Sequence, residues 1–178
     1  MIVGVAHSIE LLFDDVADSR VRDIWRALDA IGLRTPHTVD ASTVRPHCTL
    51  LAGSSVIGAD SSVAAIAQRL PLNLVLGAPL LFPTRSGFTV AASVVPSAEL
   101  LAVHATVHRL CGDAVTDLGP HCVPGSWTPH VTLARHAPVE LVAEAAALLG
   151  EPIVARATAI RRWDGDARTE RVVAGRAC

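Results

Sequence analysis

The feature that most constrains the fold is a short segment that occurs twice. Pro-His-Cys-Thr-Leu at residues 46–50 recurs as Pro-His-Val-Thr-Leu at residues 129–133, so that His130 follows His47 by 83 positions (130 − 47). Side chains at positions i and i+2 leave the same face of a β-strand. The histidine and threonine of each copy should therefore project together. Two copies of this pattern indicate a duplicated unit in which each half contributes one histidine.

This pairing also indicates a chemistry. If the two strands face each other, the imidazoles of His47 and His130 converge, and one can accept a proton while the other donates one. The hydroxyl groups of Thr49 and Thr132 would lie beside them, where they can hold phosphate oxygens. Two imidazoles and two hydroxyls favour acid/base catalysis at a phosphate.

Hydrophobic periodicity predicts the same order of elements in both halves, β-α-β-α-β, followed by one extra strand. In the first half we expect a strand from about Val3 to Phe13, a helix ended by Gly32, a motif strand over 45–52, a helix over 60–70, and a strand over 72–82 interrupted at Gly77 and Pro79. In the second half we expect a strand over 87–95, a helix capped by Ser97, a loop over 112–128, the second motif strand, a helix over 138–149, and strands over 152–163 and 168–175. Hairpin-like turns favour antiparallel sheets packed against helices, an α+β fold.

Composition limits the functional classes. The formal net charge is −2, which argues against a long nucleic-acid groove but leaves room for a small nucleotide or an RNA terminus. The four cysteines form no C-x-x-C pair, as expected of reduced cysteines in the cytoplasm. No secretory signal and no apolar run long enough for a membrane span is visible. We expect a cytoplasmic monomer that does not contact a membrane.

The chain resembles the two-histidine (2H) phosphoesterase superfamily, in particular its 2′-5′ RNA ligase-like and cyclic phosphodiesterase branch. The resemblance covers nearly the whole chain and rests on the length, the duplicated element order, the paired motifs at 46–50 and 129–133, and the following Ala134-Arg135. It implies a single bilobal domain over residues 1–178, with repeats at about 1–83 and 84–166 and a final strand over 168–175. Two lobes of antiparallel sheet with flanking helices would then surround a central cleft.

For the site, the resemblance implies metal-independent cleavage or transfer at 2′,3′-cyclic phosphates or 2′-5′ phosphodiester linkages. His47 and His130 would be the catalytic acid/base pair, and Thr49 and Thr132 would bind the phosphate. Many relatives carry a bulky residue after the first motif, where this chain has Leu51-Ala52-Gly53. We expect neither a cofactor nor a metal, because each motif offers one histidine with no adjacent carboxylate, whereas zinc needs three or four ligands.

Three further residues are candidates for substrate binding, each with an alternative interpretation. Arg45 has the right parity to share a face with His47 but lies close to the preceding loop. Arg135 has the wrong parity to share a face with His130 in a regular strand, so it reaches the phosphate only if the strand twists, and otherwise forms a surface salt bridge. Trp127, just before the second motif, either walls the pocket and stacks a base or packs beneath the loop.

The remaining histidines are assigned structural or peripheral roles. His7 interrupts an apolar strand and is interpreted as a buried, hydrogen-bonded histidine, with a place in the cleft as the alternative. His104 and His108 lie four positions apart on a predicted helix, but without a third ligand they indicate a helix edge and not a metal site. His136 is expected at the rim of the cleft, while His37 and His121 lie in loops without an assignable role.

The sequence therefore predicts an enzyme, a phosphoesterase acting on a nucleotide or RNA-end phosphate. Two alternatives stay open: a non-catalytic nucleotide-binding module with the same cleft, and a phosphodiesterase for an unrelated metabolite. The sequence does not distinguish which histidine is the acid.

Overall fold

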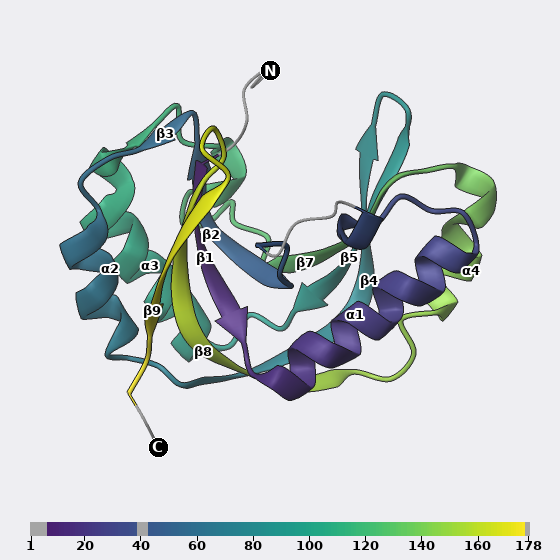
Figure 1. Ribbon diagram of the computed structural model, residues 1–178, viewed down its shortest axis with the longest axis horizontal. Helices are drawn as coiled ribbons and strands as arrows, with labels where there is room; N and C mark the ends of the chain where they lie inside the picture. Colours follow the sequence, from purple (N-terminus) through teal and green to yellow (C-terminus); the bar gives the residue numbers. More distant parts are fainter. Residues whose placement is uncertain (1–6, 39–42, 177–178) are drawn as a thin grey trace.

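The computed structural model describes residues 7–38 and 43–176, within which seven strands form one antiparallel sheet. The strand order is β2-β1-β8-β4-β5-β7, and β9 pairs with β8. The bounds are β1 His7–Phe13, β2 His47–Gly53, β4 Leu72–Thr84, β5 Gly87–Val94, β7 His130–Ala137, β8 Ile153–Asp164 and β9 Thr169–Ala174. Figure 1 shows the strands running through the middle of the molecule, with helices at both ends. The strand start expected at Val3 lies outside the described residues.

The two halves of the chain are joined within this sheet. In each half the motif strand pairs with the half's first strand, β2 with β1 and β7 with β5. Three antiparallel pairings then connect the two halves, namely β1 with β8, β8 with β4, and β4 with β5. The α+β class is confirmed, and the shared sheet supports our proposal of a single bilobal domain.

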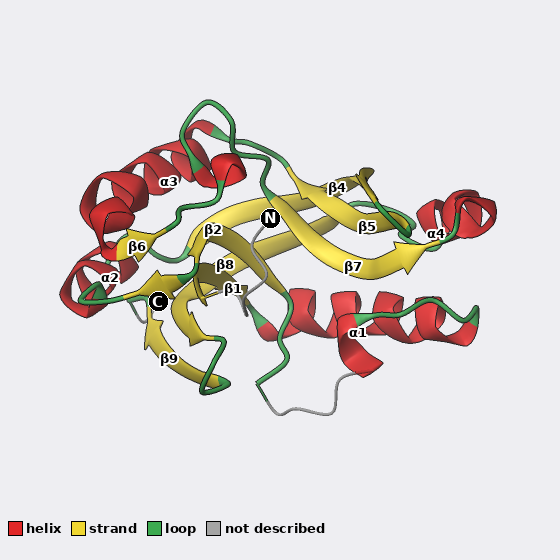
Figure 2. Cartoon of the chain, turned by 90° about the horizontal axis from the view of Figure 1, so that it is seen from above, coloured by secondary structure: helices red, strands yellow, loops and turns green. Residues whose placement is uncertain are grey.

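Four α-helices flank the sheet in the described residues, as seen from above in Figure 2: α1 Asp15–Ala30, α2 Asp60–Ala67, α3 Ala98–Cys111 and α4 Val142–Ala147. The two long helices begin where capping side chains occur in the sequence. The Asp14 carboxylate accepts a hydrogen bond from the backbone N–H of Ala17 at 2.8 Å, and the Ser97 hydroxyl does the same for Leu100 at 3.2 Å. These bonds satisfy donors that the first helical turn leaves unpaired.

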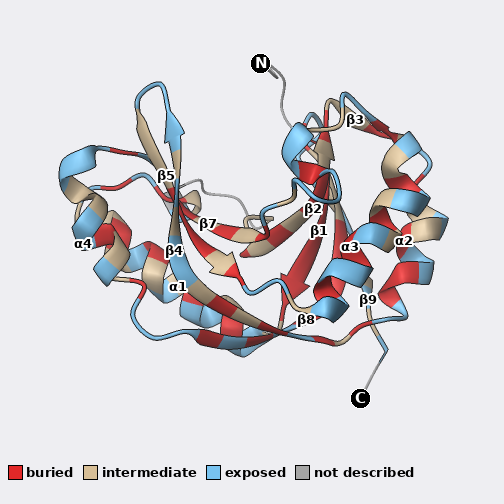
Figure 3. Cartoon of the chain, turned by 180° about the vertical axis from the view of Figure 1, so that it is seen from behind, coloured by how far each residue is buried: buried red, intermediate tan, exposed pale blue. Residues whose placement is uncertain are grey.

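Each long helix packs against the motif strand of the opposite half, α1 against β7 and α3 against β2. The apolar face of α1 buries Val21, Trp25 and Leu28. That of α3 buries Leu100, Val103 and Val107. Figure 3 shows the buried residues concentrated along the strands and on the inner faces of these helices. The core therefore holds the two motif strands in place from the side away from the histidines.

Both motif strands carry a β-bulge directly after the motif threonine. In β2, Thr49 pairs with Glu10 of β1 and Leu51 pairs with the adjacent Ile9, so Leu50 is the extra residue without a partner on β1. In β7, Thr132 pairs with Ala91 of β5 and Ala134 pairs with the adjacent Val90, so Leu133 is the extra residue. A bulge changes the parity of every side chain that follows it.

Several details differ from the expected element map. The predicted loop over 112–128 contains a short strand, β6 (Val115–Thr116), which pairs with another short strand, β3 (Ser55–Val56). The strand over 72–84 continues past Gly77, with only an irregular pairing to β5 near Pro79. The last predicted helix begins as a 3₁₀ turn after Pro138 before α4 starts. In the parts of the chain that the structure covers, no helix is both long and apolar enough to cross a membrane.

Candidate functional site

The motif side chains of β2 and β7 line two adjoining cavities. Cavity I has a volume of about 380 Å³ and lies toward β1 and β8, and cavity II has a volume of about 600 Å³ and lies toward the β4–β5 hairpin. Four residues line both cavities, namely His47, Thr49, Thr132 and Arg135, while His130 lines cavity II. The structure thus brings the four motif side chains together, with His130 on the side of cavity II.

Both imidazoles are held in the same way. The Nδ1 atom of His47 lies 2.7 Å from the backbone carbonyl oxygen of Arg45, and that of His130 lies 2.7 Å from the carbonyl oxygen of Thr128. A carbonyl oxygen only accepts hydrogen bonds, so each Nδ1 carries a proton. Each Nε2 atom is therefore the position at which the ring gains or loses a proton toward a substrate.

The threonines are fixed through their backbone and leave their hydroxyls available. The Trp127 indole donates to the carbonyl oxygen of Thr49 at 3.0 Å, and the Trp25 indole donates to that of Thr132 at 3.1 Å. Neither threonine hydroxyl makes a hydrogen bond with another residue of the described ranges. Two preoriented hydroxyl donors beside two imidazoles suit the oxygens of a phosphate.

The His130 side chain packs against an aromatic ring. Its ring lies 4.8 Å from that of Phe82, at an angle of 48°. Burial lowers the pKa of His130 below its usual value, because desolvation disfavours the charged imidazolium, and His47 and Arg135 lower it further. His130 is thereby biased toward its neutral, proton-accepting form.

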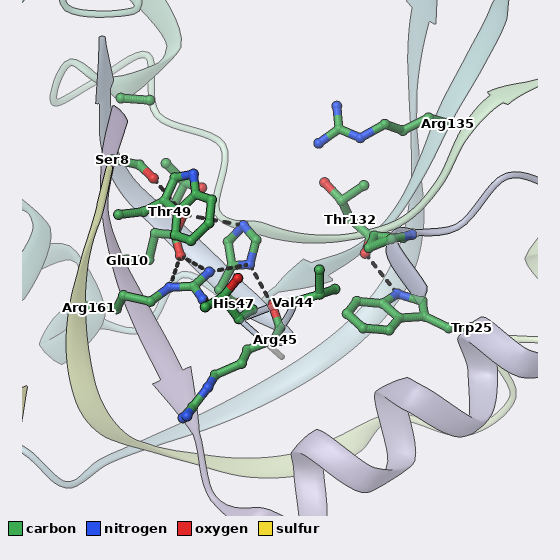
Figure 4. Close-up of a pocket in the computed structure, with 14 residues that line it drawn as sticks. Ser8, Glu10, Trp25, Val44, Arg45, His47, Thr49, Thr132, Arg135 and Arg161 are labelled. Atoms are coloured by element: carbon green, nitrogen blue, oxygen red, sulfur yellow. Dashed lines mark hydrogen bonds and ion pairs between the residues drawn. The ribbon is translucent and has the colours of Figure 1, made fainter. Parts of the chain in front are cut away.

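His47 faces a buried ion pair. Figure 4 shows Glu10 of β1 and Arg161 of β8 beside its ring. The Glu10 carboxylate accepts two hydrogen bonds from Arg161, and its Oε1 atom lies 3.6 Å from Nε2 of His47. Glu170 of β9 accepts a third hydrogen bond from the Arg161 guanidinium, at 2.9 Å. This pair places charged groups against one histidine of the site.

Arg135 reaches the site because of the bulge at Leu133. In a regular strand its parity would point it away from His130 and Thr132, but the extra residue brings it back to their face. Arg135 lines both cavities, and its guanidinium has no hydrogen-bond or ion-pair partner among the described residues. Of the two interpretations of this residue, the geometry of the described residues does not show the surface salt bridge and places the cation at the cavities.

The equivalent position of β2 is Ala52, which also lines cavity I. The next residue, Gly53, has no room for a side chain, because a Cβ atom there would lie 2.2 Å from the carbonyl oxygen of Thr116. The small residues after the first motif therefore accommodate the β3–β6 pair. Arg45 lines cavity I as well, and its guanidinium lies 3.3 Å from the Glu170 carboxylate.

Trp127 fits both interpretations of its role. One face of its indole stacks on His104, with ring centroids 3.9 Å apart and planes 3° from parallel. The ring also lines cavity II. His104 itself is buried and hydrogen-bonded to the carbonyl oxygen of Cys122, and burial lowers its pKa. The His104 ring thus supports the tryptophan that holds Thr49.

Two further histidines and the motif cysteine have contacts that need no catalytic role, whereas His121 lines cavity II with His130. His7 is buried and lies 3.3 Å from the Asp166 carboxylate, as expected for a hydrogen-bonded histidine. His136 bonds to Ser86 and lines neither cavity. Burial raises the pKa of the Cys48 thiol to about 12, which keeps it protonated and unreactive. Among residues 7–38 and 43–176, no group of three or more His, Cys, Asp or Glu side chains is placed to hold a metal ion.

Three residues of the site were not predicted from the sequence: Glu10, Arg161 and Trp25. Glu10 carries a usable signal, since it is a lone acidic residue between the apolar Ile9 and Leu11 of a buried strand. Such a residue needs a buried partner. Nothing in the sequence indicates that this partner is Arg161, 151 positions away.

Comparisons with known proteins identify the family and the fold. A model of the 2′-5′ RNA ligase superfamily matches residues 14–169. The apo structure of E. coli LigT aligns with a TM-score of 0.53 at 13% identity, covering 95% of this chain and 93% of that one. Kluyveromyces marxianus Usb1 aligns with a TM-score of 0.51 at 12% identity, covering 98% of this chain and 100% of that one.

A second E. coli LigT structure, in complex with 3′-AMP, aligns with a TM-score of 0.51 at 11% identity, covering 94% of this chain and 92% of that one. At these identities the structural matches establish the fold. No curated protein sequence matches the chain.

Proposed function

Because the chain belongs to the 2′-5′ RNA ligase superfamily, we propose that it is a phosphoesterase that cleaves a 2′,3′-cyclic phosphate or a 2′-5′ phosphodiester of a nucleotide or RNA end. The observation that carries the proposal is the matched setting of His47 and His130. Each ring has its Nδ1 atom bonded to a carbonyl oxygen, which leaves Nε2 for proton exchange. A module that only binds nucleotides has no need of two such groups.

In this proposal the phosphate lies among the residues shared by the two cavities. The hydroxyls of Thr49 and Thr132 donate hydrogen bonds to its oxygens, and Arg135 offsets its negative charge. Cavities I and II extend from this point in different directions, which leaves space for the groups attached on either side of the phosphorus. The complex of E. coli LigT with 3′-AMP supports a nucleotide as the ligand class.

Hydrolysis of a 2′,3′-cyclic phosphate illustrates the chemistry. A neutral imidazole removes a proton from water as the water oxygen bonds to phosphorus. A protonated imidazole donates its proton to the ribose oxygen as the phosphorus–oxygen bond breaks. The products are a phosphomonoester and a free ribose hydroxyl, and the same groups with reversed roles would run transfer or ligation.

A substrate panel tests the proposal. We expect the purified protein, in the presence of a chelator, to turn over at least one of a 2′,3′-cyclic nucleotide, a 2′-5′ dinucleotide or an ADP-ribose cyclic phosphate. The matched control is His136→Ala, which removes a histidine of β7 that lines neither cavity and should leave turnover unchanged. Turnover that requires an added divalent ion would refute the metal-independent mechanism. Tight nucleotide binding without any turnover would favour the non-catalytic binding module.

A further inference from the structure

The two motif strands are flanked by neighbours of different chemistry. In the first half, Thr49 pairs with Glu10 of β1, and Glu10 pairs on its other side with Arg161 of β8. Glu10 and Arg161 are each only 3% exposed. Thr49, the Glu10 carboxylate and the Arg161 guanidinium therefore come from directly neighbouring positions on β2, β1 and β8.

The second half has no such pair at the equivalent positions. Thr132 pairs with Ala91 of β5, and Ala91 pairs with Leu80 of β4. The positions next to Thr132 on these strands thus carry no charge, and His130 itself pairs with the uncharged Ser93 of β5. The duplicated fold holds the two histidines alike but gives them different electrostatic surroundings.

The contacts of Glu10 leave one of its oxygens facing His47. Its Oε2 atom accepts hydrogen bonds from Arg161 at 2.7 Å (Nε) and 2.5 Å (Nη2). Its Oε1 atom accepts a hydrogen bond from the Ser8 hydroxyl at 2.5 Å and lies 3.6 Å from Nε2 of His47. That separation is longer than a hydrogen bond. The carboxylate can therefore stabilise positive charge on the ring without taking the proton from Nε2.

Charged and titratable side chains from several elements lie around the His47 ring. Arg161 approaches closely, with Nη2 3.4 Å from Nδ1 of His47. The Arg45 guanidinium, in the segment before β2, is paired with Glu170 of β9. His130 faces His47 from β7, and Arg135 of β7 lines the same cavities. Glu10 is the carboxylate of this set closest to the ring, and it offsets the adjacent Arg161.

We propose that Glu10 is a positioning residue that keeps His47 protonated, so that His47 is the general acid and His130 the general base. This inference rests on the proposed function and assigns the roles that the motifs alone leave open. In hydrolysis of a cyclic phosphate, a water proton moves to Nε2 of His130 as the water oxygen bonds to phosphorus. The bond from phosphorus to the ribose oxygen breaks with its electron pair staying on that oxygen, which takes the proton from Nε2 of His47.

The direct test is a pH titration of the His47 ring by NMR in the full-length protein without substrate. The His47 signal is identified by its absence in His47→Ala. In Glu10→Gln the charge of Arg161 is no longer offset, so the midpoint of the His47 titration should fall by about one pH unit. Arg161→Met should raise it by a similar amount, and the double variant Glu10→Gln/Arg161→Met should return it close to the wild-type value.

Asp60→Asn is the matched control. Asp60 pairs with Arg162, the neighbour of Arg161 on β8, and with Arg171 of β9. This substitution therefore removes a carboxylate from an arginine of the same strand without a contact to His47, and the titration should not move. An unchanged midpoint in both Glu10→Gln and Arg161→Met would overturn the proposal. The opposite signs expected for the single variants keep it testable if one of them does not fold.

The rate of cyclic nucleotide hydrolysis as a function of pH then tests the assignment of roles. Glu10→Gln should move the high-pH limb to lower pH by about one unit and leave the low-pH limb in place, because the acid and not the base is affected. A shift of the low-pH limb would show that His47 is the base. If the wild-type protein hydrolyses none of the substrates, the proposed function fails, whereas the NMR result still decides whether Glu10 controls the proton on His47.

Discussion

The indole nitrogen of Trp127 donates a hydrogen bond to the backbone carbonyl oxygen of Thr49, from a residue 78 positions away. Trp25 makes the equivalent bond to Thr132 across 107 positions. Each motif strand is thus tied by a tryptophan at the residue that we expect to hold the phosphate. Each tryptophan belongs to the opposite half from the threonine that it contacts, so both bonds also couple the two halves.

Replacing either tryptophan by phenylalanine should therefore loosen the site. Trp127→Phe or Trp25→Phe leaves a carbonyl oxygen without its donor, which should cost about 1–3 kcal/mol in the free energy of unfolding. Turnover should fall several-fold at the same time, since a displaced threonine no longer meets the phosphate. Urea unfolding and steady-state kinetics measure the two effects.

Trp163→Phe is the control for these variants. The indole N–H of Trp163 makes no hydrogen bond to a described residue, although its ring lies 5.3 Å from the guanidinium carbon of Arg161. Phenylalanine retains that aromatic face, so stability should change by less than in the other two variants. Equal losses in all three would show that ring size, and not the indole hydrogen bond, matters.

Arg135 should contribute to phosphate binding. Arg135→Ala removes a cation that lines both cavities, so KM should rise by roughly tenfold, the scale of one charge-assisted hydrogen bond. Arg34→Ala removes an equal charge from the adjacent strand segment, whose backbone pairs with Arg135 but whose side chain lines neither cavity. Kinetics on the best substrate should show an unchanged KM for Arg34→Ala. Equal effects of both substitutions would indicate a general electrostatic effect in place of a specific contact.

The dependence of turnover on pH should reflect the lowered pKa of His130. A base acts in its neutral form, so the rate rises as the pH passes upward through the pKa of the base. Since burial lowers this pKa, neutral His130 persists in more acidic solution, and the midpoint of the low-pH limb should lie below about 6.5. A pH profile of kcat/KM on the free enzyme measures this limb. A midpoint clearly above 6.5 would contradict the assignment of His130 as base.

Much of the architecture could be predicted because the motif and the order of helices and strands occur twice in the sequence. The paired motifs indicated the two halves and placed the histidines and threonines, while Asp14, Gly32 and Ser97 marked helix ends. Local sequence carries such information, because strand parity and helix capping depend on near neighbours.

The unpredicted parts depend on contacts between distant residues. In a regular strand the Arg135 side chain would point away from the site, and the amino-acid sequence does not reveal the bulge at Leu133 that reverses its direction. The Glu10–Arg161 pair joins the first and penultimate strands of the chain. The role of Trp25 arises only when α1 packs against the motif strand of the other half. A single sequence does not specify these pairings.

The central claim is that His47 and His130 are the acid/base pair of a phosphoesterase. The most direct measurement is the rate of 2′,3′-cyclic nucleotide hydrolysis by the wild-type protein, His47→Ala, His130→Ala and the double variant, with circular dichroism to verify folding. Each single substitution should lower kcat by about a hundredfold or more. The double variant should lose little beyond either single one, because the two histidines act as a unit. Folded single variants that keep the wild-type rate would contradict the account and leave the histidines with a structural role.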